Sequence, residues 1–329
     1  MLVHIVILLI ALVVLVWSAD RFVVGASSIA RNMGISPMII GLTIVAMGSS
    51  APEMMVAAAA SLQGNPNTAI GNAIGSNITN IALVLGITVL IKPLIVSSST
   101  IKQELPLILL FTFLAYWILA DNQFTFLEGV FLMFGFFTFI ASLLYRAIRQ
   151  KKQNAVIDDP MIIEAEQEVP EAINNAKAIF WLIIGILLLV ASAHYLVESA
   201  VFIAQAYGIS DLVIGLTVIA VGTSLPELAA SIASIIKKED DLALGNIIGS
   251  NIFNILAVLP FAGLLAPGAI DPNASSRDAP IMIAITLLLF LLCFSRKRGF
   301  FRITRLKGGL LLACYIGYQI LLFNQSTIT

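Results

Sequence analysis

The sequence predicts an all-α integral membrane protein with ten transmembrane helices, arranged as two inverted five-helix repeats. Three observations support this fold class. First, 59% of the 329 residues are hydrophobic and only 11% are charged, whereas about a quarter of a soluble domain is charged. Second, apolar runs of about 20 residues recur, long enough to cross roughly 30 Å of hydrocarbon. Third, two motifs occur twice. A closed β-barrel would show short alternating segments instead.

The apolar runs divide into five spans on each side of a hydrophilic stretch from Arg146 to Lys177, which contains Pro160 and Pro170. This composition is typical of a linker. The first run lacks a basic start and a small-residue cleavage site, so we interpret it as a span rather than a signal peptide. We therefore expect a first repeat over 1–146, a linker over 147–177 and a second repeat over 178–329. The predicted spans are 3–28, 37–62, 68–91, 104–120, 124–146, 178–206, 212–236, 242–266, 279–295 and 308–324.

The distribution of Lys and Arg predicts the orientation of the chain in a cell membrane. With the N-terminus outside, sixteen of the eighteen basic residues fall in the turns and the linker that face the cytoplasm. Cytoplasmic loops carry such an excess of positive charge. The exceptions are Arg21, within the first span, and Arg277 in an outside loop. We expect both termini outside and the linker in the cytoplasm.

The two halves carry the same pair of motifs at a constant offset. IGLTIVAMGSSAPE (40–53) matches IGLTVIAVGTSLPE (214–227), and GNAIGSNITN (71–80) matches GNIIGSNIFN (245–254). The offset is 215 − 41 = 174 for the first pair and 245 − 71 = 174 for the second. An odd number of spans in each half inverts one copy relative to the other. Interrupted helices at matching places in two inverted halves indicate a binding site near the midplane of a transporter.

Each copy of the first motif places a glutamate, Glu53 or Glu227, inside an apolar span. A charge at mid-span costs about 2.5–3.5 kcal/mol on insertion scales, so two at equivalent positions indicate function. The alternative is a pair of protonated acids that are hydrogen-bonded within the bundle. We interpret them as carboxylates that face one cation, because hard cations bind oxygen. The neighbouring polar side chains are all oxygen donors: Ser49, Ser50, Ser76, Asn77, Asn80, Thr223, Ser224, Ser250, Asn251 and Asn254.

A proline precedes each glutamate. Pro52 and Pro226 each remove a helical hydrogen bond and displace the carbonyl four residues earlier, which predicts breaks in the second and seventh spans. Irregular backbone at this depth is tolerated where it lines a cavity, so the carbonyls around 46–48 and 220–222 are candidate ligands. The glycine pairs of the second motif, at 71 and 75 and at 245 and 249, predict close helix packing.

Other charged residues in the spans fit structural roles. We expect Asp20 and Arg21 to pair locally, Glu198 to lie at an outer cavity or interface, and Glu104 and Glu128 to be interfacial. The chain has two histidines, and neither is near a motif, so we expect no enzyme and no resident cofactor. We expect no nucleic-acid partner, and no obligate protein partner is evident from the sequence.

These motifs, G-[ST]-S-x-P-E and G-N-x-I-G-S-N-I-x-N, resemble those of the sodium/calcium exchanger superfamily of cation/Ca²⁺ antiporters. The chain is similar to the short prokaryotic branch. The resemblance implies a central Ca²⁺ site formed by the two glutamates with oxygens around Ser49 and Thr223. It implies flanking Na⁺ sites and an Asn pair that completes the cluster. Some members have Asp where this chain has Asn254, which leaves K⁺ dependence open. The implied Na⁺ and central residues are Ala46, Ser50, Ser76, Asn80, Ala220, Ser224, Ser250 and Asn254.

The expected function is secondary antiport, in which inward Na⁺ movement drives Ca²⁺ out as the first and sixth spans slide over the rest. Ca²⁺ and Na⁺ are then the transported partners. Two alternatives remain open. The same glutamates would exchange protons for Ca²⁺ if burial let them protonate. A passive Ca²⁺-permeable channel would use the same oxygens without coupling.

Overall fold

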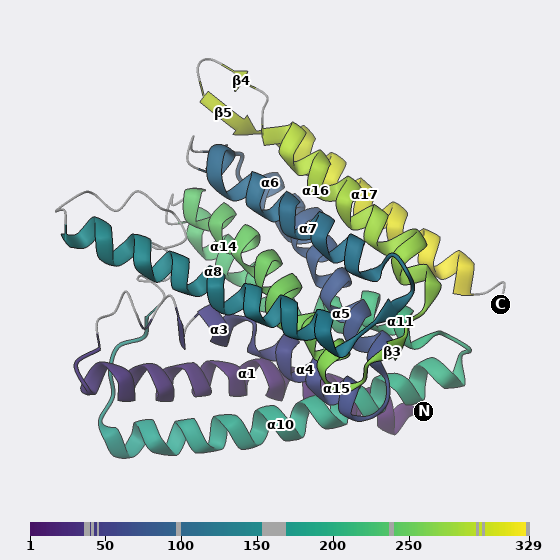
Figure 1. Cartoon of the computed structure of the whole chain (residues 1–329), viewed down its shortest axis with the longest axis horizontal. Coiled ribbons are helices and arrows are strands. Elements are labelled where there is room, and N and C mark those ends of the chain that lie inside the picture. Colours follow the sequence, from purple (N-terminus) through teal and green to yellow (C-terminus); the bar gives the residue numbers. More distant parts are fainter. Residues whose placement is uncertain are drawn as a thin grey trace.

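The computed structural model shows a bundle of helices with short strands at its two ends (Figure 1). The two chain termini lie at the same end of the molecule. The end of α8 and the start of α10 lie at the opposite end. The structure describes residues 1–35, 40, 43–44, 46–96, 100–152, 169–236, 240–293, 296–297 and 300–326.

In the first half, α1 is one unbroken helix of 31 residues, and the next span is divided into the short α3 and the longer α4. Two segments adopt the wider π-helical winding, η2 and η3. The elements are α1 (Leu2–Asn32), α3 (Ala46–Ser49), α4 (Ala51–Leu62), α5 (Pro66–Ile78), η2 (Thr79–Val84), α6 (Leu85–Ile91), β1 (Leu94–Val96), η3 (Thr100–Glu104), α7 (Leu105–Leu119), β2 (Gln123–Phe124) and α8 (Phe126–Lys152).

The second half repeats this series, and its helix limits lie within one residue of an offset of 174, except that α17 begins at Arg305 and the strand β5 occupies the equivalent of the start of α8. For example, α7 at 105–119 corresponds to α16 at 279–293. The elements are α10 (Asn175–Ala206), α11 (Asp211–Ile214), η4 (Gly215–Ile219), α12 (Ala220–Thr223), α13 (Leu225–Ile236), α14 (Asp240–Phe253), η5 (Asn254–Val258), α15 (Pro260–Leu265), β3 (Gly268–Ala269), η6 (Ala274–Asp278), α16 (Ala279–Cys293), β4 (Arg296–Lys297), β5 (Phe300–Ile303) and α17 (Arg305–Ser326).

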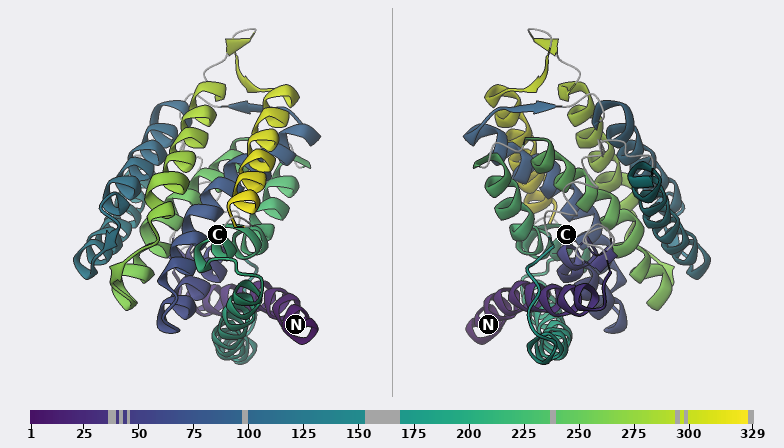
Figure 2. Two further views of the ribbon diagram at one scale, coloured as in Figure 1. Left: turned by 90° about the vertical axis from the view of Figure 1, so that its right-hand side faces the viewer. Right: turned by 90° about the vertical axis from the view of Figure 1, so that its left-hand side faces the viewer.

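The third and eighth spans form the centre of the bundle. In the span from Pro66 to Ile91, 78% of the apolar window is buried, and in that from Ala243 to Leu265, 83%. Only 28% is buried in α1 and in α10, which lie side by side as an outer pair beneath the other helices (Figures 1 and 2). The core is thus built around the second repeated motif. The outer pair, α1 and α10, has much less of its apolar surface buried against other helices.

Each end of the bundle carries a small sheet that joins the two halves. At one end β1 pairs with β5, antiparallel, with Leu94 opposite Ile303, and β4 pairs with β5. At the other end β2 pairs with β3, with Gln123 opposite Ala269. β1 and β3 occupy equivalent places in the repeats, but their pairing differs, because β3 pairs with β2 whereas β1 pairs with β5, whose equivalent residues belong to α8.

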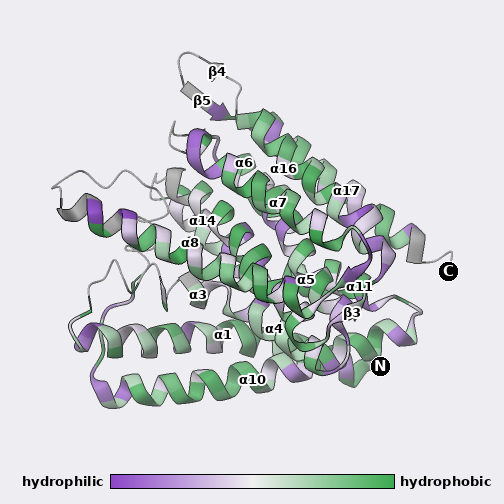
Figure 3. Cartoon of the chain, viewed as in Figure 1, coloured by the Kyte–Doolittle hydropathy of each residue, from purple (hydrophilic) through white to green (hydrophobic). Residues whose placement is uncertain are grey.

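Among the described residues, nine helices are long and apolar enough to cross a membrane, and Ala51–Leu62 is a shorter apolar helix. Their limits agree with the predicted spans to within a few residues. The first part of the second predicted span includes residues 36–39, 41–42 and 45, which lie outside the described residues, as does the linker stretch 153–168. Hydrophobic residues cover the middle of α1, α10 and α17, and hydrophilic residues gather near helix ends (Figure 3).

The expected linker begins later than its sequence limit of 147, because α8 continues as a helix to Lys152. At its other end the linker lies against the end of α1. The Asn32 amide donates to the Ile173 carbonyl (2.9 Å), and the Ile173 amide donates to Ser28 Oγ (3.2 Å).

Candidate functional site

Both predicted helix breaks are present, and they have the same geometry. The chain leaves helical conformation at one residue, Ser50 (φ −91°, ψ 8°) in the first half and Ser224 (φ −85°, ψ 2°) in the second. Pro52 lies in the first turn of α4, where its missing N–H costs nothing. Each motif therefore forms two short helices, with its glutamate one turn after the break.

The two glutamates are buried near each other. Glu53 is 1% exposed and Glu227 is 3% exposed, and their charges are close enough to repel. The Thr223 hydroxyl lies near the Glu53 carboxylate. Within the described part of the chain, neither carboxylate oxygen of Glu53 meets a hydrogen-bond donor in good geometry. A buried carboxylate without a donor is costly unless a cation compensates it.

Four asparagines join the two halves next to this acidic pair. Asn80 Nδ2 donates to Asn251 Oδ1 (3.1 Å), and Asn254 Nδ2 donates to Asn77 Oδ1 (3.4 Å). These two bonds are equivalent under the repeat, because 80 + 174 = 254 and 77 + 174 = 251. The internal symmetry thus reaches the hydrogen bonds at the centre of the bundle.

Each bond leaves one amide oxygen of the motif unused. Asn80 Oδ1 and Asn254 Oδ1 are buried and accept no hydrogen bond from any described residue. The same is true of Ser76 Oγ and Ser224 Oγ. Buried polar atoms are normally satisfied, so this group of unsatisfied oxygens requires an explanation. Hard cations take six to eight oxygen ligands, which suits two carboxylates surrounded by neutral oxygens. Among the described residues, no group of three or more His, Cys, Asp or Glu side chains is placed so that it could hold a metal ion.

The remaining predicted residues lie on the same elements. Ser50 is 1% exposed, whereas Ser49, at the end of α3, is half-buried. The Ala220 carbonyl oxygen accepts a hydrogen bond from the Ser224 amide (3.1 Å), which leaves one lone pair of that oxygen unused. Ala46 is the first residue of α3. Ser250 Oγ is directed at Asn246 Oδ1 (3.4 Å). The predicted set therefore lies on the two broken spans and on the two central spans of the bundle.

The glycines of the second motif bring the central helices into backbone contact. A Cβ at Gly71 would lie 2.4 Å from the Leu212 carbonyl oxygen, and one at Gly75 would lie 2.7 Å from Leu216 Cα. Any larger residue would separate α5 from η4 and move the oxygens of one half away from the other. The close packing predicted for this pair is confirmed.

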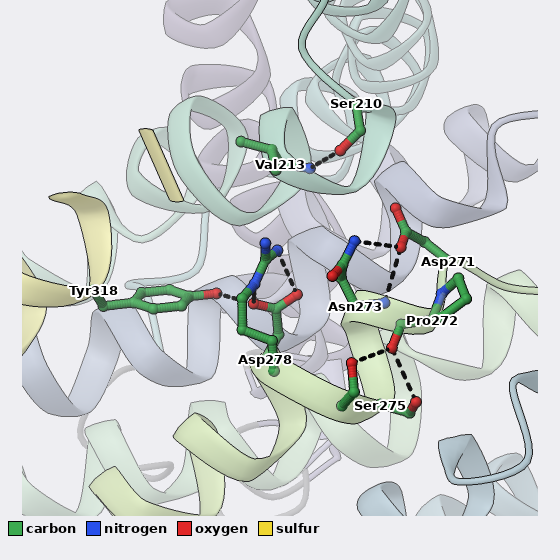
Figure 4. Close-up of polar contacts among 10 residues, drawn as sticks. Ser210, Val213, Asp271, Pro272, Asn273, Ser275, Asp278 and Tyr318 are labelled. Carbon is green, nitrogen blue, oxygen red and sulfur yellow. Dashed lines mark hydrogen bonds and ion pairs between the residues drawn. The ribbon is translucent and has the colours of Figure 1, made fainter. Parts of the chain in front are cut away.

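Sequence reasoning missed a second pair of equivalent acids, Glu104 and Asp278 (278 − 104 = 174). Glu104 was expected at an interface, but it is 4% exposed, because η3 turns it into the bundle. Asp278 is fully buried and accepts two bonds from Arg277 (2.7 and 3.0 Å) and one from Tyr318 (2.9 Å; Figure 4). The signal was present: each acid stands two residues before a proline.

The charged residues Asp20, Arg21 and Glu198 lie on the outer helices α1 and α10. Arg21 pairs with Asp20 (2.5 Å) and lies over the Trp17 and Trp181 rings, as expected for a structural role. The Glu198 side chain is 55% exposed and lies 3.9 Å from His194 on α10. Glu198 is thus an exposed acid on an outer helix.

Comparison with known proteins gives consistent matches over nearly the whole chain. The family described as "Sodium/calcium exchanger protein" matches residues 3–145 and 177–324, one stretch in each half. "Putative antiporter CaxA" from Alkalimonas amylolytica is 56% identical over 99% of this chain and 100% of its own length. "Sodium/calcium exchanger MaX1" from Methanosarcina acetivorans is 33% identical over 98% and 99%.

A bacterial relative and a solved structure extend the comparison. "Inner membrane protein YrbG" from Escherichia coli is 41% identical over 88% of each chain. The sodium-calcium exchanger NCX_Mj, in a structure soaked with 100 mM Na⁺ and 10 mM Sr²⁺, has a TM-score of 0.60 with 33% identity over 96% of this chain and 97% of its own.

Proposed function

Because this chain belongs to the sodium/calcium exchanger family, and is therefore a multi-pass cation/Ca²⁺ antiporter, we propose that it exchanges Na⁺ for Ca²⁺ by alternating access. One observation carries the proposal. Two broken helices bring Glu53 and Glu227 into one buried centre, next to oxygens that no described residue satisfies. Two carboxylates balance one Ca²⁺, or they are shared by several Na⁺.

The proposed ligand set is the one that the resemblance of the two motifs to the family implies. Ca²⁺ lies between the two glutamates, with Ser49 and Thr223. Na⁺ ions bind on either side, and Asn80 and Asn254 complete the middle through their unused amide oxygens. Like-charge repulsion and shared ligands make the two ion types compete. The Na⁺ ligands are Ala46, Ser50, Ser76, Ala220, Ser224 and Ser250.

We also propose ten spans in two inverted repeats, with both termini outside and the linker in the cytoplasm. The termini lie at one end of the molecule and the ends flanking the linker lie at the other, which supports this topology (Figure 1). A reporter fused to the C-terminus is expected to be active outside the cytoplasm. A cytoplasmic reporter would overturn the orientation.

Asymmetry between the halves supports alternating access. In the part of the chain that is described, α10 lies along α4, but α1 makes no comparable contact with α13, its equivalent partner. Consequently Ala51 at the start of α4 is 8% exposed, whereas the equivalent Leu225 on α13 is 48% exposed. Two halves of similar sequence that pack differently are expected of a carrier captured in one of two states.

The function is tested by ⁴⁵Ca²⁺ uptake into proteoliposomes loaded with Na⁺. Uptake is expected to require the Na⁺ gradient and to be lost in Glu53→Gln and in Glu227→Gln. Glu198→Gln is the matched control, because it removes an exposed carboxylate from another span. If both central variants transport normally, the ion site is wrong.

Two further arms of this assay separate the alternatives. A pH gradient without Na⁺ drives uptake only in a H⁺/Ca²⁺ antiporter, so flux in that arm would reject Na⁺ coupling. Uptake that needs neither gradient and does not saturate with Ca²⁺ indicates a channel.

A further inference from the structure

Asn72 connects the two broken helices. It lies on α5 and is fully buried. Its Nδ2 donates a hydrogen bond to the backbone carbonyl oxygen of Glu53 on α4 (3.1 Å), and its Oδ1 accepts one from the Thr223 hydroxyl on α12 (3.4 Å). One side chain thus fixes the glutamate backbone of the first half relative to the broken helix of the second half. Asn72 is not among the proposed ion ligands.

The equivalent residue, Asn246, is placed differently. By the offset of 174, it would donate to the Glu227 carbonyl and accept from Ser49. Instead its Oδ1 accepts from Ser250 Oγ, on its own helix (3.4 Å). Thr223, held by Asn72, is fully buried, whereas Ser49 is half-buried. The asparagine connection is therefore formed in one half and absent from the other.

The difference follows the packing of the outer helices. The half whose connection is formed includes α4, which α10 covers. The half without it includes α13, with which α1 makes no comparable contact among the described residues. At the covered end, Gln63 at the end of α4 also reaches His194 on α10, with its Nε2 3.3 Å from the His194 carbonyl.

We propose that Asn72 and Asn246 are positioning residues whose connections form alternately, each closing one side of the site during transport. This rests on the alternating-access antiport proposed above. In the structure described here, Asn72 closes the α4 side. In the opposite state Asn246 joins Glu227 to Ser49 while Asn72 is released. The pair would thus couple the shape of the ion site to the side that is open.

The test measures the two openings by spin-label distances, without transport. One pair labels the ends of α10 and α4 (Tyr207→Cys, Leu62→Cys). The other labels the equivalent ends of α1 and α13 (Met33→Cys, Ile236→Cys). The four side chains are 65–75% exposed. Cys293 and Cys314 are first replaced by alanine.

Asn72→Ala is expected to move population from the short to the long α10–α4 distance, with the reverse change for α1–α13. The population ratio should shift at least roughly fivefold, the effect of losing one buried hydrogen bond of ordinary strength, because Asn72→Ala removes two such bonds. Adding Asn246→Ala to this variant is expected to reverse the shift, because it removes the connection of the opposite state.

Thr88→Val is the control, because it removes a buried hydrogen bond within one helix and should leave both distances unchanged. Asn72→Leu, which keeps the side-chain volume, replaces Asn72→Ala if the latter fails to fold. No shift with Asn72→Ala, or a shift that Asn246→Ala does not reverse, overturns the proposal. The spin-label test measures distances and no ion flux, so it is independent of the proposed function. That function would be refuted separately, by Ca²⁺ uptake that does not depend on Na⁺.

Discussion

The contact between α1 and α10 gives a prediction that can be worked from distances. A Cβ at Gly25 would lie 2.5 Å from the Leu182 amide nitrogen and 2.7 Å from the Ala178 carbonyl oxygen. A Cβ at Gly185 would lie 2.7 Å from the Phe22 amide nitrogen. Carbon atoms in van der Waals contact are about 3.5–4.0 Å apart, so either alanine forces the two helices apart by roughly 1 Å.

Overpacking of this kind costs about 1–3 kcal/mol, a factor of roughly 5 to 150 in the unfolding equilibrium. Gly25→Ala and Gly185→Ala are therefore each expected to unfold at a lower SDS fraction in mixed micelles. Gly317→Ala is the matched control, because it lies on α17 with no heavy atom within 4 Å of its new Cβ. If the Gly25 and Gly185 variants unfold where the control does, the inferred backbone contact is wrong.

Three more predictions concern other parts of the structure. Asp278→Asn removes the buried negative charge that Arg277 and Tyr318 contact and should destabilise the protein by about 3–5 kcal/mol in the same unfolding assay, with part of the loss recovered by adding Arg277→Gln. Equal stability of the single variant and wild type would contradict this. A thiol cross-link between Gln63→Cys and His194→Cys should stop Ca²⁺ uptake, because it fixes α10 on α4. A cross-link between α1 and α10 should leave uptake unchanged. Undiminished uptake with the first cross-link would exclude movement of α10 relative to α4. Asn254→Asp adds a third carboxylate and should strengthen Ca²⁺ binding in titration calorimetry at least tenfold, about 1.4 kcal/mol, and unchanged affinity would place this side chain outside the ion site.

Much of the fold followed from hydrophobicity and repetition. Span limits were predictable because apolar length is a local property of the sequence. Pro52 and Pro226 predicted a break in the second and the seventh span, because proline acts on the residues before it, and the structure has these breaks at Ser50 and Ser224. The residue types around the glutamates indicated oxygen ligands, and the structure places Ser50 and Ser224 at the breaks and the four asparagines on the central helices.

The parts that could not be predicted depend on how helices rotate against each other. The bonds of Asn72 to two different broken helices are invisible in the chain, because they depend on the packing of α5 against η4. The burial of Glu104 depends on the π-helical turn before α7. The repeated motifs are also nearly identical, so the sequence does not show that the two halves pack differently, as the burial of Ala51 and the exposure of Leu225 do.

The strand pairs have a consequence for how the protein is made. β1, at residues 94–96, is synthesised long before its partner strand β5, at 300–303. α6 likewise packs on α17, where Gly86 contacts Gly308. The last span to leave the ribosome thus completes contacts with one of the first. Until then α6 and η2 lack the helix that they pack against in the folded protein. A chain truncated before α17 would also leave Asp278 without the Tyr318 hydroxyl, so we expect cellular proteases to remove it.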